Sequence, residues 1–306
     1  MAALPAQRIG NGTPADAAGA GPVLILRPPS DELSRWVADR MDGLEAGALR
    51  ARRRKVGLIL RDADGAIVGG LTGYSVATDF YVHLLWVAAP LRGAGLGRTL
   101  MLAAERLAAE RGCGRIFLNT MGFQAPGFYA GLGYTELGVM PDFVWGAGRH
   151  YFRKAVSTRP VPALPAGLRI DLAEPPAADG VKAIEDGLDA HWVERVPDRY
   201  SLIGAAARDG AGGRAAGATG VIDGEWFTLV DLWIEPGRRG RGLGAAMLSA
   251  LEDAARDARC RFATVMAMDW QSPAFFDRHG YAVALHLDDY VLGRARTWFR
   301  KRLDHA

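Results

Sequence analysis

The stretch that decides the fold is Arg92-Gly93-Ala94-Gly95-Leu96-Gly97, and it recurs as Arg239-Gly240-Arg241-Gly242-Leu243-Gly244. The offset between the two copies is 147 residues (239 minus 92). The same offset, without a gap, superimposes further matches: Leu85-Trp86 on Leu232-Trp233, Cys113 on Cys260, and Phe152-Arg153-Lys154 on Phe299-Arg300-Lys301. A repeat of this length is a whole domain rather than an element of a solenoid. The sequence therefore predicts two homologous domains in tandem.

Each copy of the loop joins a strand to a helix. Its glycines let the backbone adopt unusual dihedrals and approach a ligand closely. The first amides of the following helix lack partners and lie at its positive end, so they favour a phosphate, and Arg92 and Arg98 add charge. Taken alone, such a loop is also typical of a plain strand-to-helix turn. It is not a P-loop, which needs Gly-Lys-Ser/Thr at its end, and the strands predicted before it argue against a Rossmann site.

Length and composition set the domain organisation. The chain has 306 residues, 49% of them hydrophobic and 23% charged, as expected for two ordinary globular domains. We expect a flexible tail over 1–22, a first domain over 23–154, a Pro-rich linker over 155–166 and a second domain over 167–306. The stretches 56–60, 66–74 and 81–87 of the first domain are predicted strands.

Net charge and cysteine content limit the partners and the cellular location that we expect. The net charge is +3 and no basic stripe interleaves with aromatics, so we expect no nucleic-acid partner. No apolar run approaches the roughly 20 residues of a membrane-spanning helix. Two cysteines, Cys113 and Cys260, give neither a disulfide framework nor a metal cluster. A reducing, cytoplasmic location is expected, with both cysteines as small apolar packing residues.

Two motifs resemble those of the GCN5-related N-acetyltransferase (GNAT) superfamily. The superfamily's acetyl-CoA motif is similar to the strand Leu85-Trp86-Val87 followed by Arg-Gly-x-Gly-Leu-Gly. The motif that follows it in the superfamily is similar to residues 123–134, which contain Phe128-Tyr129 and Gly133-Tyr134. The resemblance covers about 81–154 and again 228–301. It implies an α/β (α+β) fold with two tandem GNAT domains, each a mixed, mostly antiparallel sheet flanked by helices.

The resemblance also implies an acetyl-CoA-dependent N-acetyltransferase without a metal, in which an amine attacks the thioester directly in a ternary complex. Gly122 departs from the family, because many relatives carry an asparagine there that contacts the pantetheine. The implied cofactor-binding residues are Leu85, Val87, Arg92, Gly93, Ala94, Gly95, Gly97 and Arg98, with a possible second site at Ile234, Arg239, Gly240, Gly242 and Gly244.

Two residues are candidates for the proton transfers. Tyr129 occupies the position of the family's usual general acid; the alternative is a core tyrosine beside Phe128. His83 is the candidate base, since its spacing to Arg92 resembles that of a catalytic histidine in serotonin N-acetyltransferase and imidazole titrates near neutrality. Period-two alternation predicts that His83 shares a face with Leu85 and Val87. The alternative for His83 is a purely structural histidine. Asp79 and Asn119 are reserve candidates for the base. His150 is expected to be an ordinary strand or surface histidine.

The second copy lacks both candidates, because Phe276 aligns with Tyr129 and Val230 with His83. We therefore expect the second domain to bind acyl-CoA poorly and to support the first, although Asp231 stays a candidate base. Three alternatives stay open: another acyl-CoA as donor, a non-catalytic acyl-CoA-binding protein, and a site in the second domain. The expected acceptor is a small-molecule or peptide amine. The domains are expected to pack as an intramolecular pseudo-dimer within a monomer or homodimer.

Overall fold

The computed structural model describes residues 21–144, 146–193 and 201–303. The predicted tail therefore lies outside the described residues except for Gly21 and Pro22. Residues 156–165, within the predicted linker, form neither helix nor strand. No helix among the described residues is long and apolar enough to cross a membrane.

The chain divides into two compact units, each with one seven-stranded sheet. The Tyr129 unit comprises the described parts of Leu49–Pro197 and Val291–Gly293. Its sheet order is β6-β7-β5-β4-β3-β2-β8, and only β4 and β5 are parallel. Its elements are β2 (Arg54–Arg61), β3 (Ile67–Val76), β4 (Asp79–Val87), η2 (Ala89–Leu91), α2 (Leu96–Glu110), β5 (Arg115–Met121), α3 (Pro126–Gly131), β6 (Thr135–Val144), β7 (Ala147–Ala155), β8 (Arg169–Ala173) and α4 (Ala178–Val193).

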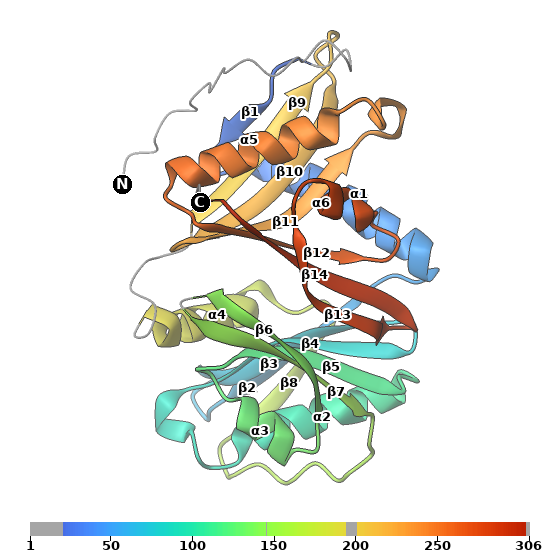
Figure 1. Cartoon of the computed structure of the whole chain (residues 1–306). Helices are drawn as coiled ribbons and strands as arrows, with labels where there is room; N and C mark the ends of the chain where they lie inside the picture. The colour runs from blue at the N-terminus through green and yellow to red at the C-terminus, as the bar shows by residue number, and fades with distance from the viewer. Residues whose placement is uncertain (1–20, 145, 194–200, 304–306) are drawn as a thin grey trace. The chain divides into compact units, whose positions relative to one another are not determined.

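The Phe276 unit comprises the described parts of Met1–Ala48, Asp198–Tyr290 and Arg294–Ala306. Its sheet order is β1-β9-β10-β11-β12-β14-β13 (Figure 1). Its elements are β1 (Leu24–Leu26), α1 (Asp31–Leu49), β9 (Ser201–Arg208), β10 (Arg214–Asp223), β11 (Trp226–Ile234), η3 (Pro236–Arg238), α5 (Leu243–Asp257), β12 (Phe262–Met268), α6 (Ala274–Arg278), β13 (Ala282–Val291) and β14 (Arg294–Arg302). Two mixed sheets with flanking helices confirm the predicted fold class.

The two repeats exchange their first strand and helix. Strand β1 pairs with β9, with Leu26 opposite Gly204, and β8 pairs with β2, with Ala173 opposite Gly57. The predicted domains at 23–154 and 167–306 stay a prediction about the sequence repeat. In the compact units, β1 and α1 group with the Phe276 unit, and β8 and α4 group with the Tyr129 unit. The physical reason is the repeat itself. Leu26 and Ala173 differ by the same 147 positions as Gly57 and Gly204, so each edge strand matches either sheet edge.

Glycines let the exchanged helices approach their sheets closely. A Cβ added to Gly70 would lie 2.7 Å from Cδ1 of Ile184 in α4, and one added to Gly187 would overlap the Trp86 ring in β4. In the other unit a Cβ on Gly217 would lie 2.8 Å from Cγ2 of Val37 in α1. Each exchanged helix thus packs on the face opposite α2 or α5, whose side chains fill the main hydrophobic core of their unit.

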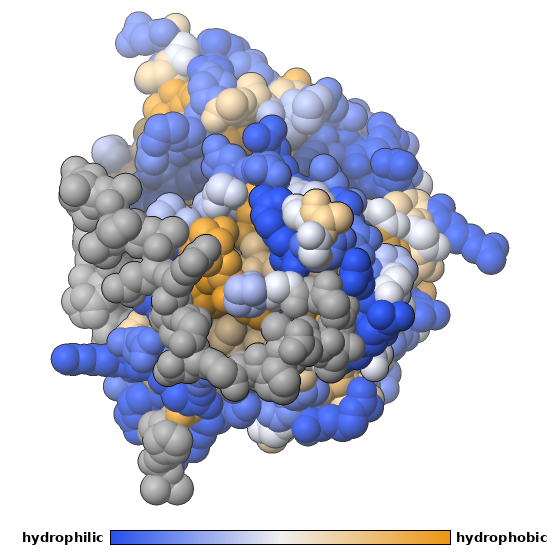
Figure 2. Space-filling view, turned by 90° about the horizontal axis from the view of Figure 1, so that it is seen from above, coloured by the Kyte–Doolittle hydropathy of each residue, from blue (hydrophilic) through white to orange (hydrophobic). Residues whose placement is uncertain are grey.

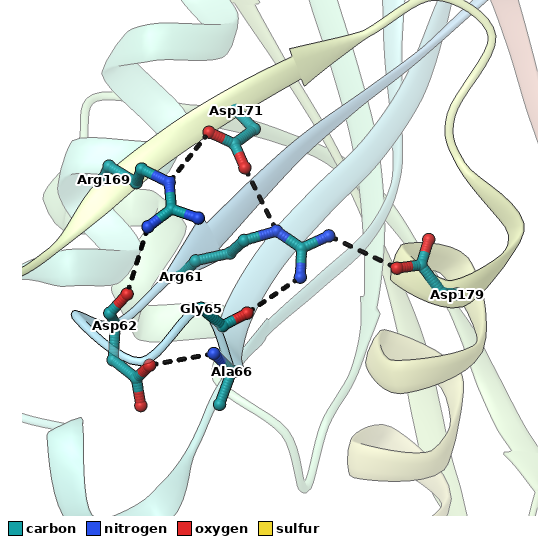
Figure 3. A network of polar contacts seen from close by, with 7 residues as sticks. All are labelled: Arg61, Asp62, Gly65, Ala66, Arg169, Asp171 and Asp179. Atoms are coloured by element: carbon teal, nitrogen blue, oxygen red, sulfur yellow. Dashed lines mark hydrogen bonds and ion pairs between the residues drawn. The ribbon is translucent and has the colours of Figure 1, made fainter.

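Polar contacts fix β8 and α4 to the Tyr129 unit (Figure 3). The Arg61 guanidinium on β2 donates to Asp171 on β8 (3.1 Å), to Asp179 on α4 (3.3 Å) and to the Gly65 carbonyl (3.0 Å). Half-exposed ion pairs of this kind contribute little stability, typically about 0–1 kcal/mol each. Their role here is positional, since one side chain sets the relative placement of three elements.

A buried ion pair holds α2 against β7. The Glu105 carboxylate on α2 is inaccessible to solvent and accepts hydrogen bonds from Lys154 (2.8 and 2.9 Å), Ser157 (2.7 Å) and Tyr134 (3.2 Å). The Phe276 unit repeats the pair, with Lys301 Nζ 2.7 Å from Glu252. Removing one partner of a buried pair costs roughly 3–5 kcal/mol, so this contact firmly anchors the helix that begins at each glycine-rich loop.

The surface shows few large hydrophobic groups. Hydrophilic side chains cover most of the face seen from above, and hydrophobic ones show near its centre (Figure 2). The large hydrophobic side chains exposed among the described residues are Leu172, Leu202, Val230 and Val283. Two of these, Leu202 and Val230, are the repeat equivalents of Lys55 and His83 in the Tyr129 unit.

The exchange predicts that a cut in the linker does not separate the two halves of the chain. A protease site inserted within 158–163 divides the chain between β7 and β8, yet each sheet then still holds a strand from both pieces. The pieces should coelute in size-exclusion chromatography under native conditions and separate only when urea unfolds them. Separation of the cut but folded protein into two peaks would contradict the exchanged arrangement.

Candidate active site

The glycine-rich loop of the Tyr129 unit is exposed and conformationally specialised. Gly93 and Gly95 have φ of +83° and +79°, and Gly95 is the N-cap of α2. A Cβ on either glycine would meet nothing within 4 Å, so backbone conformation rather than packing requires glycine here. Gly240 and Gly242 repeat the geometry, with φ of +74° and +82°. In both units an exposed glycine-rich loop therefore leads directly into a long helix, whose first amides have no partner within the helix.

Arginine side chains brace both loops against the preceding strand. Arg92 Nε donates to the Val87 carbonyl (2.9 Å), and Arg239 Nε donates to the Ile234 carbonyl (3.0 Å). The Arg98 side chain is exposed in the first turn of α2. The loop, the end of β4 and the start of α2 thus form one braced element that an anion can approach.

Strand β4 parts from its parallel neighbour early. The ladder with β5 covers only Asp79–Tyr81 opposite Arg115–Phe117. Beyond Tyr81 the backbone of β4 is not paired with β5 in the described sheet. The segment that includes Leu85 and Val87 therefore has main-chain groups free of the β4–β5 ladder, as a backbone-bound ligand requires.

A β-bulge sits where the strands part. Thr72 of β3 lies opposite Leu84, but the next residue, Gly73, lies opposite Val82, so His83 is the extra residue. The Phe276 unit has the same bulge at Val230, between the pairs Thr219–Asp231 and Gly220–Leu229. A bulge adds one residue to one strand and breaks the alternation of side chains.

The bulge corrects one prediction about His83. Leu85 and Val87 pack against the core that contains Val82, whereas His83 is exposed and its ring centroid lies 6.5 Å from that of Tyr81. The prediction that His83 shares a face with Leu85 and Val87 is therefore wrong, because strict alternation does not survive the extra residue. His83 instead lies on the α4 side of the sheet, on the face opposite the main core.

The surroundings of His83 favour the neutral imidazole. Its pKa is lowered, first because the protein displaces water from part of the ring and then because Arg149, Arg53 and Lys55 are positively charged. The residue is nevertheless exposed, so the side chain is accessible to a small molecule. A neutral, accessible imidazole at pH 7 is suited to accept a proton. Sequence analysis missed these three basic residues, because only the folded sheet brings each of them near enough to act on His83.

Tyr129 lies in the short helix α3, within a buried aromatic cluster. Its side chain is 8% exposed, and its ring centroid lies 5.0 Å from Phe128, 6.1 Å from Tyr134 and 5.9 Å from Phe152. Burial raises the pKa of Tyr129 to about 12. Its hydroxyl makes no hydrogen bond to the described residues. The phenol therefore stays protonated at neutral pH with a proton available to donate.

The Phe276 unit reproduces this cluster without the hydroxyl. The Phe276 ring centroid lies 5.1 Å from Phe275, 5.8 Å from Tyr281 and 5.8 Å from Phe299. The geometry matches that around Tyr129 to within a few tenths of an ångström. The difference between the units at this position is therefore chemical and not architectural.

The reserve candidates are engaged elsewhere. The buried Asp79 carboxylate receives two hydrogen bonds of 3.0 Å from Arg115, and Asn119 donates to the Tyr81 hydroxyl. His150 Nδ1 lies 2.7 Å from Glu136. In the other unit the Asp231 carboxylate accepts a hydrogen bond of 3.4 Å from Thr219. His83, by contrast, is exposed and lies on β4 itself.

The described residues contain no group of three or more His, Cys, Asp or Glu that could hold a metal ion. Cys113 and Cys260 are both buried. Burial raises the pKa of each thiol, that of Cys260 to about 11, so both stay protonated. Packing in the two hydrophobic cores accounts for them.

The charges around His83 generate a prediction about its titration. In the folded protein its pKa should lie below the ordinary value of about 6.5. Arg149→Gln should raise it, because a positive neighbour that disfavours the imidazolium is removed. Histidine NMR titration of both proteins, with the signal assigned by His83→Gln, measures the shift. A wild-type pKa at or above 6.5, or an unchanged pKa in Arg149→Gln, would refute this picture.

Comparison with known proteins identifies the family to which the chain belongs. It matches the Acetyltransferase (GNAT) family over residues 27–134 and 167–281. It is 43% identical over 91 residues to blasticidin-S acetyltransferase of Streptomyces morookaense, which covers 29% of this chain and 67% of that protein. It is 34% identical over 86 residues to an acetyltransferase of Agrobacterium fabrum, which covers 28% of this chain and 63% of that protein.

Among solved structures, an acetyltransferase from Bacillus cereus is 28% identical, with 42% of this chain and 96% of that chain covered and a TM-score of 0.38. The family match spans most of both repeats, and each repeat carries the loop and the aromatic helix described above. This protein is therefore a tandem member of the GNAT acetyltransferase family.

Proposed function

We propose that the protein is an N-acetyltransferase that takes the acetyl group from acetyl-CoA and transfers it to a primary amine, at a single site in the Tyr129 unit. The observation that carries the proposal is a contrast within one chain. Both units present the same loop and bulge, but only one supplies a phenol at Tyr129 and an imidazole at His83, where the other has Phe276 and Val230.

The loop and strand supply the donor site. The pyrophosphate of acetyl-CoA fits the amides around Gly93, Gly95 and Gly97, where the helix dipole of α2 favours negative charge. The pantetheine arm would follow β4 past Leu85 and Val87, where the backbone is not paired with β5. A backbone amide there polarises the thioester carbonyl and stabilises the oxyanion of the tetrahedral intermediate.

Two proton transfers complete the reaction. The acceptor ammonium loses a proton to His83, directly or through a water molecule, and its nitrogen lone pair then attacks the thioester carbon. When the carbon–sulfur bond breaks, the leaving thiolate takes the phenolic proton of Tyr129. The resulting phenolate is a strong base, because burial raises the pKa of Tyr129 to about 12. It recovers a proton from the attacking nitrogen, which is positively charged and acidic once it is bonded to the carbonyl carbon, and His83 releases its own proton to solvent. The amine is acetylated and free coenzyme A departs.

The acceptor class is open to direct screening. The relative from Streptomyces morookaense is named as a blasticidin-S acetyltransferase, so that antibiotic is a suitable first amine. Small amines and peptide amines follow. Other acyl-CoA donors, and acyl-CoA binding without transfer, are alternatives that the same assays distinguish.

The intact loop of the Phe276 unit makes a matched binding test possible. Gly95→Val and Gly242→Val each place a β-branched residue at a φ near +80°, which such residues rarely adopt. Calorimetric titration should show that Gly95→Val weakens acetyl-CoA binding at least about tenfold, equivalent to roughly 1.4 kcal/mol of lost contacts. Gly242→Val should leave the strong site unchanged. The reverse pattern would move the site to the Phe276 unit, and absence of binding to wild type would refute an acyl-CoA function.

The aromatic clusters offer a second matched pair. Tyr129→Phe removes one hydroxyl and keeps the packing that Phe276 already shows is compatible with the fold. We expect kcat to fall by about a hundredfold, within the range for loss of a general acid, with the acetyl-CoA Kd unchanged. Phe276→Tyr in the other unit should change neither quantity. Full activity in Tyr129→Phe would remove the phenol from the mechanism and leave a core aromatic residue.

A further inference from the structure

The chain offers few amines of its own to an acetyltransferase, because only four of its 37 basic residues are lysines. The others are arginines, which stay protonated in proteins and offer no amine to acetylate. Three of the four lysines donate to a carboxylate, namely Lys154 to Glu105 (2.8 Å), Lys182 to Asp186 (2.8 Å) and Lys301 to Glu252 (2.7 Å). An amine held as an ammonium ion has no lone pair with which to attack a thioester.

Lys55, near the start of β2, is the exception. Its side chain is exposed, and its ammonium forms no hydrogen bond or ion pair with the residues that the structure describes. Lys182 is exposed as well, but a hydrogen bond to Asp186 raises its pKa and keeps it charged. Lys55 therefore has the most available amine among the four lysines.

The strand register brings Lys55 to the same side of the sheet as the candidate base. Lys55 of β2 pairs with Tyr74 of β3, which pairs with Tyr81 of β4. Val56 belongs to the main core, so Lys55 points to the opposite face, where His83 lies. Strands β2 and β4 are two spacings apart, about 10 Å, and lysine has a long flexible stem. Burial is the main reason that the pKa of His83 is lowered, and the charge of Lys55 adds to it, as two nearby side chains require.

The Phe276 unit provides an internal comparison. In place of the amine, the imidazole and the phenol it has Leu202, Val230 and Phe276. Leu202 is 46% exposed and Val230 is 50% exposed, so the fold requires neither a lysine nor a histidine at these positions. The available amine, the candidate base and the candidate acid occur together in one unit and are all absent from the other.

We propose that Lys55 is a self-acetylation site, and that the Tyr129 unit transfers an acetyl group from acetyl-CoA to the Lys55 amine of its own chain when no external acceptor is bound. This inference rests on the proposed acetyl transfer. His83 takes a proton from the Lys55 ammonium, and the lone pair on Nζ attacks the thioester carbon. The carbon–sulfur bond breaks, the thiolate takes the phenolic proton of Tyr129, and the nitrogen returns a proton to the phenolate. The products are acetyl-lysine and coenzyme A.

Acetylation of Lys55 changes the charge beside His83. Acetyl-lysine is neutral, so one of the three cations that act on His83 is lost. The pKa of His83 should then rise, because a positive neighbour that disfavours the imidazolium is removed. This shift is a second readout of the modification, independent of the mass of the protein.

The test incubates the full-length protein with acetyl-CoA and no added amine, and follows it by intact-mass spectrometry and peptide mapping. Each chain should gain one acetyl group, on Lys55, with a rate constant that does not change when the protein is diluted. Lys55→Arg, which keeps the charge, should gain none, and Lys182→Arg should react as fast as wild type. Tyr129→Phe should slow the modification at least about tenfold, as expected for loss of a general acid. Histidine NMR should show a higher pKa for His83 in the acetylated protein.

Equal acetylation of Lys55 and Lys182, or an unchanged rate in Tyr129→Phe, would indicate spontaneous chemistry and overturn the proposal. A rate constant that falls on dilution would also overturn it, because one molecule would then be acetylating another. Transfer to an added amine without modification of Lys55 would sustain the proposed function and refute self-acetylation. Acetyl-CoA binding without transfer to Lys55 or to any added amine would refute the proposed function, and self-acetylation with it.

Discussion

The main-chain ladder between β2 and β8 is the interaction on which the rest of the Tyr129 unit depends. It adds an edge strand from beyond the linker to a sheet built by the first repeat, and it brings α4 with it. The Arg61 contacts then fix where that helix starts, and Gly70 and Gly187 set how closely it lies. The unit that carries the candidate site is therefore assembled from both halves of the chain, and the ladder between β1 and β9 does the same for the other unit.

Within the Tyr129 unit, one extra residue in β4 determines how the groups of the proposed site are arranged. The bulge at His83 lies next to the point where β4 leaves β5, so strand backbone and imidazole become accessible together. The same residue separates the two faces, with Leu85 and Val87 turned to the core and His83 turned to the opposite face, beside Tyr81. In the proposed mechanism the donor site and the base therefore lie on one strand, and Tyr129, on a helix packed in the core, would supply the acid.

Local patterns predicted much of this structure. The repeat, the glycine-rich loops, the helices after them and the family were all accessible from Arg92–Gly97, its second copy and the Phe128-Tyr129 motif, because these signals lie within short segments. The exchange of β1 and β8 between the two sheets could not be predicted from the sequence, since the two strands are equivalent copies and each matches either sheet edge. The bulge at His83 and the positive charges of Lys55 and Arg149 around it were also missed, because the bulge depends on the register between β3 and β4 and the charges depend on the order of strands in the sheet.

The claim that one unit carries the donor site is tested most directly by hydrogen–deuterium exchange of the full-length protein with and without acetyl-CoA. Amides of the loop and first turn of α2, from Gly93 to Arg98, should become protected when acetyl-CoA binds, because the pyrophosphate takes their hydrogen bonds. The equivalent amides from Gly240 to Ala245 serve as the internal reference and should change much less. Protection confined to the 240–245 segment would contradict the assignment and place the donor in the Phe276 unit.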